Sequence, residues 1–173
     1  MSARHATLAA ALLTLAVPPA ADAATDGALG AESEATSTVS FVKQNAVRIS
    51  GVDDVDFGTR SHLSGSERFI DRVCVYSSTG GYAIAASSAN GAFRLESEDT
   101  PDTIPYRLQW IASGAVSELE HGVPVGGLAG HSSDIDCRGR TNASLRVIVA
   151  AGDFNRVDPG AYGDSLLLLV RPE

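Results

Sequence analysis

Cysteines, aromatic side chains and basic residues are all scarce in this sequence of 173 residues. Its two cysteines are too few for a zinc cluster and enough for one disulfide. Lys and Arg number 13 against 21 Asp and Glu, and the resulting formal net charge of -8 argues against a nucleic-acid-binding protein. After residue 17 no apolar run exceeds the length of a strand, so the sequence predicts no stable membrane anchor.

The N-terminus has the pattern of an export signal. Arg4 precedes an uninterrupted apolar run over residues 7–17, and Ala21-Asp22-Ala23 has the small-x-small pattern of a signal peptidase site. The run is too short to cross a bilayer, which needs about 20 residues. We therefore predict a signal peptide over residues 1–23 and a mature chain that starts at Ala24; the alternative is an uncleaved N-terminal helix.

Most of the remaining chain alternates apolar and polar residues with the period of a strand. Residues 24–38 are small and acidic and predict a flexible leader, and the strand pattern starts at Val39. No later segment keeps a helical period for three turns. The sequence thus predicts an all-β fold, an antiparallel β-sandwich over residues 39–173. The expected strands cover residues 39–49, 52–57, 70–76, 82–86, 93–95, 104–110, 145–149 and 165–170.

Cys74 and Cys137 lie in or beside two of the expected strands. An exported protein meets an oxidising compartment, so a disulfide between them is the expected state. The bridge would close a loop worth about 4 kcal/mol of stability in the chain-entropy model. Two buried free thiols are the alternative.

The sequence offers little that resembles catalytic or metal-binding machinery. Residues 130–134 (GHSSD) approach a nucleophile elbow, but Asp134 replaces the second glycine and no alternating βα pattern surrounds it. The remaining candidates have neither metal-ligand nor EF-hand spacing, and they predict loop and turn residues. They are His62, His121, His131, Asp53, Asp54, Asp56, Asp134 and Asp136. Asn142-Ala143-Ser144 matches a glycosylation sequon at the start of a strand. We expect no enzyme activity, no catalytic or metal site and no cofactor.

The last expected strand is apolar on both faces. Leu166, Leu168 and Val170 lie on one face, and Leu167 and Leu169 lie on the other. Such a strand needs cover on each side, and a free edge on it would template the addition of another strand. From the residues alone, a central strand of a complete sandwich is the preferred interpretation, because core strands have the same pattern.

Residues 160–172 (GAYGDSLLLLVRP) resemble the G-x-Y-x-D-x-L-x-[LIV]-x-V-x-P ending of chaperone–usher pilins. Three upstream segments resemble the spore-coat-U-like (archaic, Csu-type) and class 5 fimbrial subunits of that family in the same order. They are residues 56–59 (DFGT), residues 73–75 (VCV) with 81–84 (GYAI), and residues 104–108 (IPYRL). The resemblance extends from about residue 50 to the C-terminus.

The resemblance implies an immunoglobulin-like sandwich that lacks its last strand and is completed by a donor strand. A periplasmic pilus chaperone would fill the groove first, and the N-terminal extension of a neighbouring pilus subunit would replace it at the outer-membrane usher. The implied groove residues are Leu166, Leu168 and Val170, with Tyr162 at the entrance. The protein would be a structural or adhesive subunit that passes through the periplasm to a fimbrium on the cell surface.

Two points stay open at this stage. The donor segment is either residues 24–38 or residues 39–49, and the second of these also fits the first strand of the domain. The alternative function is a stand-alone secreted or periplasmic β-sandwich that binds a ligand such as a glycan. The expected core contains Phe57, Tyr82, Ile84, Tyr106, Leu108 and Trp110.

Overall fold

A computed structural model describes residues 24–173, which divide into a short N-terminal unit and a sandwich domain. The first unit ends at Lys43, and the domain runs from Gln44 to Glu173, so it begins after the predicted Val39. Every described residue of the first unit is exposed, and Thr25 and Thr36 are joined there by two backbone hydrogen bonds of 3.2 and 3.1 Å. The predicted signal peptide, residues 1–23, lies outside the described residues.

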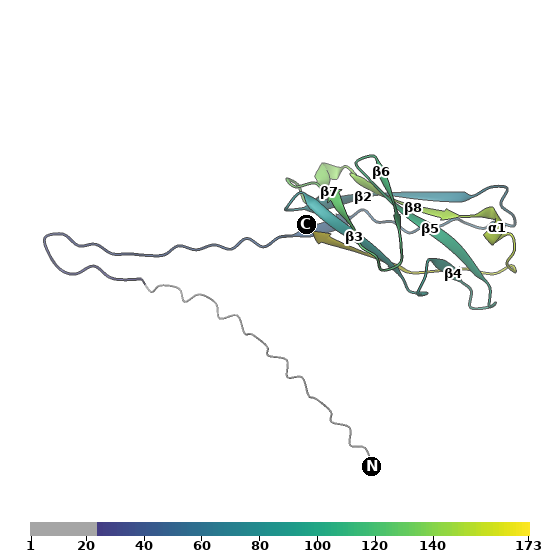
Figure 1. The fold of residues 1–173 in the computed structure, drawn as a ribbon, viewed down its shortest axis with the longest axis horizontal. Coiled ribbons are helices and arrows are strands. Elements are labelled where there is room, and N and C mark those ends of the chain that lie inside the picture. Colours follow the sequence, from purple (N-terminus) through teal and green to yellow (C-terminus); the bar gives the residue numbers. More distant parts are fainter. Residues whose placement is uncertain (1–23) are drawn as a thin grey trace, which may run out of the picture. The chain divides into compact units, whose positions relative to one another are not determined.

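One layer of the domain is a sheet of six antiparallel strands (Figure 1). Its order is β1-β2-β8-β5-β4, and β6 also pairs with β5. β5 pairs with β8 along one edge and with β4 and β6 along the other, so both of its edges are occupied. The strands are β1 (Val47–Ser50), β2 (Glu67–Ser77), β4 (Arg94–Glu96), β5 (Thr103–Ala112), β6 (Ala115–Leu119) and β8 (Ala143–Val149).

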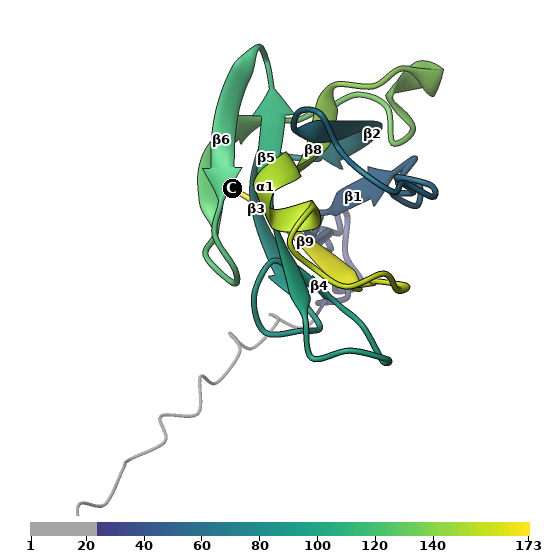
Figure 2. The same cartoon turned by 90° about the vertical axis from the view of Figure 1, so that its right-hand side faces the viewer.

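The second layer is a sheet of three antiparallel strands in the order β7-β3-β9. Its strands are β3 (Gly81–Ser88), β7 (Val125–Ala129) and β9 (Leu166–Pro172). The short helix α1 (Ala151–Phe154) and the 3-10 turn η1 (Cys137–Gly139) are the helical elements of the described chain. Figure 2 shows β9 beside β1 at one side of the sandwich. The predicted all-β, immunoglobulin-like antiparallel sandwich is confirmed.

The core forms where the alternating strands turn their apolar faces toward each other. In β5 every second residue from Ile104 to Ala112 is buried, as the alternation predicts. Trp110 and Tyr82 are both fully buried, and the Trp110 indole Nε1–H donates to the Tyr82 hydroxyl at 2.9 Å across the two sheets. Burial raises the pKa of Tyr82. This contact joins β5 of the larger sheet to β3 of the smaller one.

A disulfide joins Cys74 of β2 to Cys137 of η1, with their Cα atoms 6.0 Å apart. The pairing agrees with the sequence prediction. Cys137 and Arg138 have φ values of 49° and 55°, in the left-handed region that residues with a side chain rarely adopt. The bridge therefore holds an unfavourable turn against the sheet.

The segment from residue 39 to residue 60 differs from the predicted pattern of two strands. Only Val47–Ser50 forms a strand, and residues 51–60 have no strand partner among the described residues. Gly51 ends β1 with a φ of 77°, which a residue with a Cβ atom rarely adopts. Residues 52–57 alternate like a strand, but no neighbouring edge reaches them.

Candidate functional site: a free strand edge beside an apolar cavity

β9 is hydrogen-bonded to another strand along one edge only, because the smaller sheet ends at this strand. At one end of its pairing with β3, the Ala89 N–H donates to the Ser165 carbonyl at 2.9 Å. At the other end, the Glu173 N–H donates to the Gly81 carbonyl at 3.1 Å. Backbone groups alternate between the two edges of a strand. The odd-numbered residues of β9 therefore bond to β3, and the even-numbered residues direct their backbone groups to the free edge.

The side chains of the same even-numbered residues point into the sandwich. Leu166, Leu168 and Val170 are half-buried and pack against the core. Leu167 and Leu169 lie on the outer face and are 66% and 44% exposed. β9 thus presents an unpaired backbone and a row of partly covered apolar side chains on one side. This combination is what an added β-strand requires.

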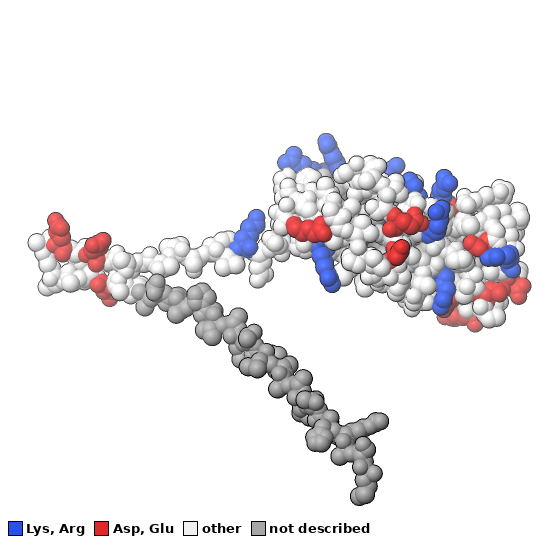
Figure 3. All heavy atoms as spheres, viewed as in Figure 1, with Lys and Arg blue, Asp and Glu red and all other residues white. Residues whose placement is uncertain are grey.

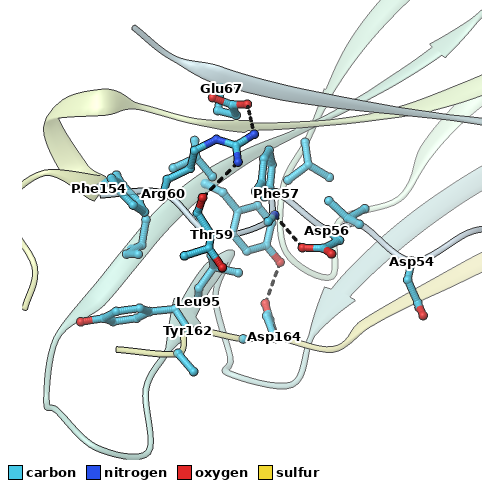
Figure 4. Close-up of a pocket in the computed structure, with 18 of the residues that line it drawn as sticks. Asp54, Asp56, Phe57, Thr59, Arg60, Glu67, Leu95, Phe154, Tyr162 and Asp164 are labelled. Atoms are coloured by element: carbon cyan, nitrogen blue, oxygen red, sulfur yellow. Dashed lines mark hydrogen bonds and ion pairs between the residues drawn. The ribbon is translucent and has the colours of Figure 1, made fainter. Parts of the chain in front are cut away.

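An open cavity of about 1190 Å³ lies beside this free edge (Figure 4). Leu166 and Leu168 form one wall, and residues 52–61 form the opposite wall. Small-molecule sites usually have volumes of about 300–1,000 Å³, so the cavity exceeds that range. Its floor consists of buried residues of β5 and β8, namely Ile104, Tyr106, Leu145, Val147 and Val149.

The wall opposite β9 is held by side chains and not by a strand ladder. The Asp53 N–H donates to the buried carboxylate of Asp71 at 3.0 Å, and the Gly58 N–H donates to Asp56 at 2.6 Å. Phe57 is half-buried and meets Phe69 edge-on, with ring centroids 6.4 Å apart. Side-chain hydrogen bonds and one aromatic contact therefore hold this wall in place.

One end of the cavity is closed by α1 and the loop that follows it. Phe154 and Tyr162 lie on that side in Figure 4, with Asp54 at the opposite side. The Tyr162 hydroxyl donates to the Asp158 carbonyl at 2.7 Å and lies 3.2 Å from the Thr100 hydroxyl. These contacts fix Tyr162 just before the start of β9.

A buried hydrogen-bond cluster fixes the start of β9. The Tyr106 and Ser88 hydroxyls donate to the same Asp164 carboxylate oxygen at 2.6 and 2.7 Å. Burial, followed by the hydrogen bond and the negative charge of Asp164, raises the pKa of Tyr106 far above its ordinary value. Tyr106 therefore stays protonated and donates across the physiological pH range. Gly163 adds two backbone hydrogen bonds of 2.9 Å with Glu96.

Carboxylates outnumber cations around the cavity. Arg60 and Glu67 lie 3.6 Å apart and neutralise each other. The other charged residues that line the cavity are all acidic and take part in no ion pair within the described chain. They are Asp53, Asp54, Asp56, Asp158 and Asp164. The apolar floor therefore has an acidic rim.

The structure brings three of the four predicted groove residues to the cavity. Tyr162, Leu166 and Leu168 line it, whereas Val170 does not. Val170 lies on the same face of β9, but toward the end of the strand where β1 approaches β9. Phe57, predicted as a core residue, packs against the core while half-buried, and it also lines the cavity. In the sequence, the DFGT motif at residues 56–59 was the feature that could have indicated this wall.

The remaining candidates stay outside this site. His121 lies 3.2 Å from the Ser88 carbonyl and meets the Phe93 ring edge-on, and His131 accepts the Asp134 N–H at 3.0 Å. The Asn142 side chain bonds to both backbone groups of Val75 at 2.8 and 2.9 Å, so the sequon asparagine is engaged in the fold. Within residues 24–173 no cluster of three His, Cys, Asp or Glu side chains is placed to hold a metal ion.

Comparison with solved structures shows a likeness in fold. A chain of the solved chaperone–tip adhesin complex, described as vital for synergistic activation of CFA/I fimbriae biogenesis, superposes with a TM-score of 0.56 at 17% sequence identity. The match covers 73% of this chain and 41% of the other, so this chain spans less than half of that neighbour's length. The two share a fold. No family model and no curated protein matches the sequence. No helix of the described residues is long and apolar enough to cross a membrane.

Proposed function

We propose that this protein is a non-enzymatic structural or adhesive subunit of a surface pilus, assembled by donor-strand exchange. The observation that carries the proposal is the free edge of β9 beside an apolar cavity. A strand laid along that edge would accept and donate backbone hydrogen bonds at Leu166, Leu168 and Val170 and cover their side chains. The expected partners are a periplasmic chaperone, an outer-membrane usher and neighbouring subunits.

The energetics of β9 support strand addition. An unpaired edge with apolar side chains promotes association with other strands. Burying apolar side chains contributes about 0.8 kcal/mol per CH₂ group, and Leu166 and Leu168 are each only partly covered. A partner that supplies alternating apolar residues would therefore stabilise the domain and prevent aggregation.

The structural neighbour supports the same role at the level of the fold. It belongs to a complex of a chaperone and a fimbrial tip adhesin. Exchange through the chaperone–usher pathway goes beyond that likeness and rests on the free edge and on the ordered motifs of the sequence.

The first described unit offers a strand that could be donated. Val39 and Phe41 are 94% and 89% exposed. They are two residues apart, so in an extended segment their side chains point to the same side. Residues 47–50 are already paired with β2, so the later part of the candidate segment 39–49 is not free to be donated.

A fused strand tests the proposal. We compare the exported chain with a version that carries an alternating apolar strand after Glu173, reached through a flexible linker. The fusion should be a soluble monomer with a higher melting temperature, whereas the unfused chain should aggregate or assemble. Leu168→Asp, inside the groove, should abolish the gain because it places a charge against an apolar partner.

Leu167→Asp is the matched control, because Leu167 lies next to Leu168 on the exposed face of β9. This variant should retain the full gain from the fused strand. The proposal is wrong if the unfused chain is a stable monomer whose melting temperature the added strand does not change. That outcome would favour the stand-alone ligand-binding sandwich.

A further inference from the structure

The sequence contains a single lysine, Lys43, at the end of the exposed N-terminal unit. In an extended chain Lys43 shares a face with Val39 and Phe41, because side chains two and four residues apart point the same way. The three side chains thus form a stripe of two apolar groups followed by one cation. The four-carbon stem of lysine can cover apolar surface while its amine stays at the rim.

The cavity beside β9 presents the complementary pattern. Its floor is apolar, and the five carboxylates of its rim have no cationic partner within the described chain. Figure 3 shows several acidic side chains at the end of the sandwich domain that carries α1 and β4, with basic side chains beside them. Carboxylates that share a rim repel one another, and a cation held among them relieves that repulsion.

We infer that Lys43 of one copy forms ion pairs with the acidic cavity rim of a second copy and thereby selects residues 39–43 as the donated strand. The inference rests on the proposed function and adds the residue that sets its specificity. The partner is a second copy of this chain, because its charge pattern complements the cavity.

The same electrostatics exclude the other candidate donor. Residues 24–38 carry Asp26, Glu32 and Glu34 and no cation. The rim would repel that segment, and its residues are mostly Ala, Gly, Ser and Thr, which offer little apolar surface to the floor. Within the second candidate, residues 39–43 combine apolar alternation and a cation, and they precede Ala46, whose backbone is bonded to Ser78 beside the sheet.

Acetylated peptides of residues 36–46 test the inference. The receiving protein is the full exported chain carrying Lys43→Arg, which removes its only side-chain amine. The wild-type and Lys43→Arg peptides should bind alike. At low salt the Lys43→Gln peptide should bind about two- to fivefold more weakly, and the Lys43→Glu peptide should be weaker still. The differences should fade at 0.5 M salt, because screening is then strong.

A carbodiimide cross-link locates the contact. The wild-type peptide has one amine, so an amide bond should form with a rim carboxylate such as Asp54, Asp56 or Asp158. Asp54→Asn combined with Asp56→Asn on the receiving chain should reduce the preference for the cationic peptides. In the wild-type chain, the same reagent should link two copies and yield a dimer.

The outcomes separate this inference from the proposed function. Four peptides that bind equally tightly would overturn the role of Lys43 and leave strand addition standing. A cross-link confined within single wild-type chains would overturn the assignment to a second copy. If no peptide binds and the fused strand has no effect, both the inference and the proposed function are wrong.

Discussion

β5 and β9 both direct apolar side chains inward at every second position, and these side chains end in different environments. Both alternate inward apolar residues with outward ones. β5 has partners along both edges, and its inward Leu108 is fully buried. β9 has a partner along one edge, and its inward Leu168 stays half-buried. The difference comes from a missing neighbour and not from the strand itself.

The comparison shows where function can reside in a fold of this kind. In β5 the backbone bonds and side-chain contacts are completed within the domain, so the strand contributes to stability. In β9 half of the backbone groups and part of each inward side chain remain available to another chain. The fold is therefore complete on one side and open on the other.

Two leucine truncations sharpen this comparison and should give the largest effects. Leu108→Ala should lower the free energy of unfolding by about 2–5 kcal/mol, as in other fully buried sites. Leu168→Ala should lower it by roughly half as much in the unfused chain, because less apolar area is lost. With a strand fused after Glu173 the two costs should converge. Urea denaturation measures all four values, and equal costs in the unfused chain would contradict the comparison.

Removal of the disulfide between Cys74 and Cys137 should have the next largest effect, because it acts on the part of the domain away from the free edge of β9. Replacing Cys74 and Cys137 by Ser should destabilise the domain by about 2–5 kcal/mol, since the loop between them is long. The affinity of the domain for a donor peptide should change little, because neither residue lines the cavity. Thermal unfolding and peptide titration of the double variant give both numbers. A large loss of peptide affinity would show that the disulfide and the cavity beside β9 are coupled.

The cluster at the start of β9 should have a smaller effect on stability. Asp164→Asn removes the negative charge of the carboxylate that accepts hydrogen bonds from the Tyr106 and Ser88 hydroxyls. The substitution should lower the free energy of unfolding by about 1–3 kcal/mol. It should also loosen the entrance to β9 and weaken strand addition. Tyr106→Phe is the companion variant, because it removes one donor and keeps the carboxylate. Unchanged peptide affinity in both variants would confine this cluster to stability.

Low pH should have the smallest effect on stability, and it should act on the loop that carries Cys137. The Asp136 N–H, donating to the Asp134 carboxylate, lowers the pKa of Asp134 below its ordinary value of 3.8. A carboxylate whose pKa is lowered by folding stabilises the folded state at pH values above its ordinary pKa. This stabilisation is lost as the pH falls through the pKa of the folded state. Wild type should therefore be slightly more stable than Asp134→Asn at pH 7, and the difference should vanish near pH 2. A constant difference across this range would contradict the assignment.

The sequence predicted most of the paired strands, because their alternation reflects burial on one face, but it missed β6 and β7. Ile104, Leu108 and Trp110 are buried as the period-2 pattern requires. The same pattern misassigned residues 52–57, because alternation reports which face is apolar and not whether a neighbouring strand exists. Phe57 accordingly packs against the core from a segment outside the sheets and also lines the cavity.

The candidate site was predictable in part. Leu166 and Leu168 were identified from the last strand, and the structure places them on its free edge. The opposite wall and the floor come from segments far apart in the chain, which one-dimensional periodicity does not bring together. The ion-pairing state of the rim carboxylates likewise depends on the folded arrangement.

Hydrogen exchange along β9 tests the central claim most directly, because it reads the free edge residue by residue. In a soluble, dilute sample of the unfused chain, the amides of Leu166, Leu168 and Val170 should exchange fast, and those of Leu167 and Leu169 should exchange slowly. With the fused strand, all five amides should exchange slowly. If the even-numbered amides of the unfused chain are already as protected as that of Leu108, the edge of β9 is covered and the account is wrong.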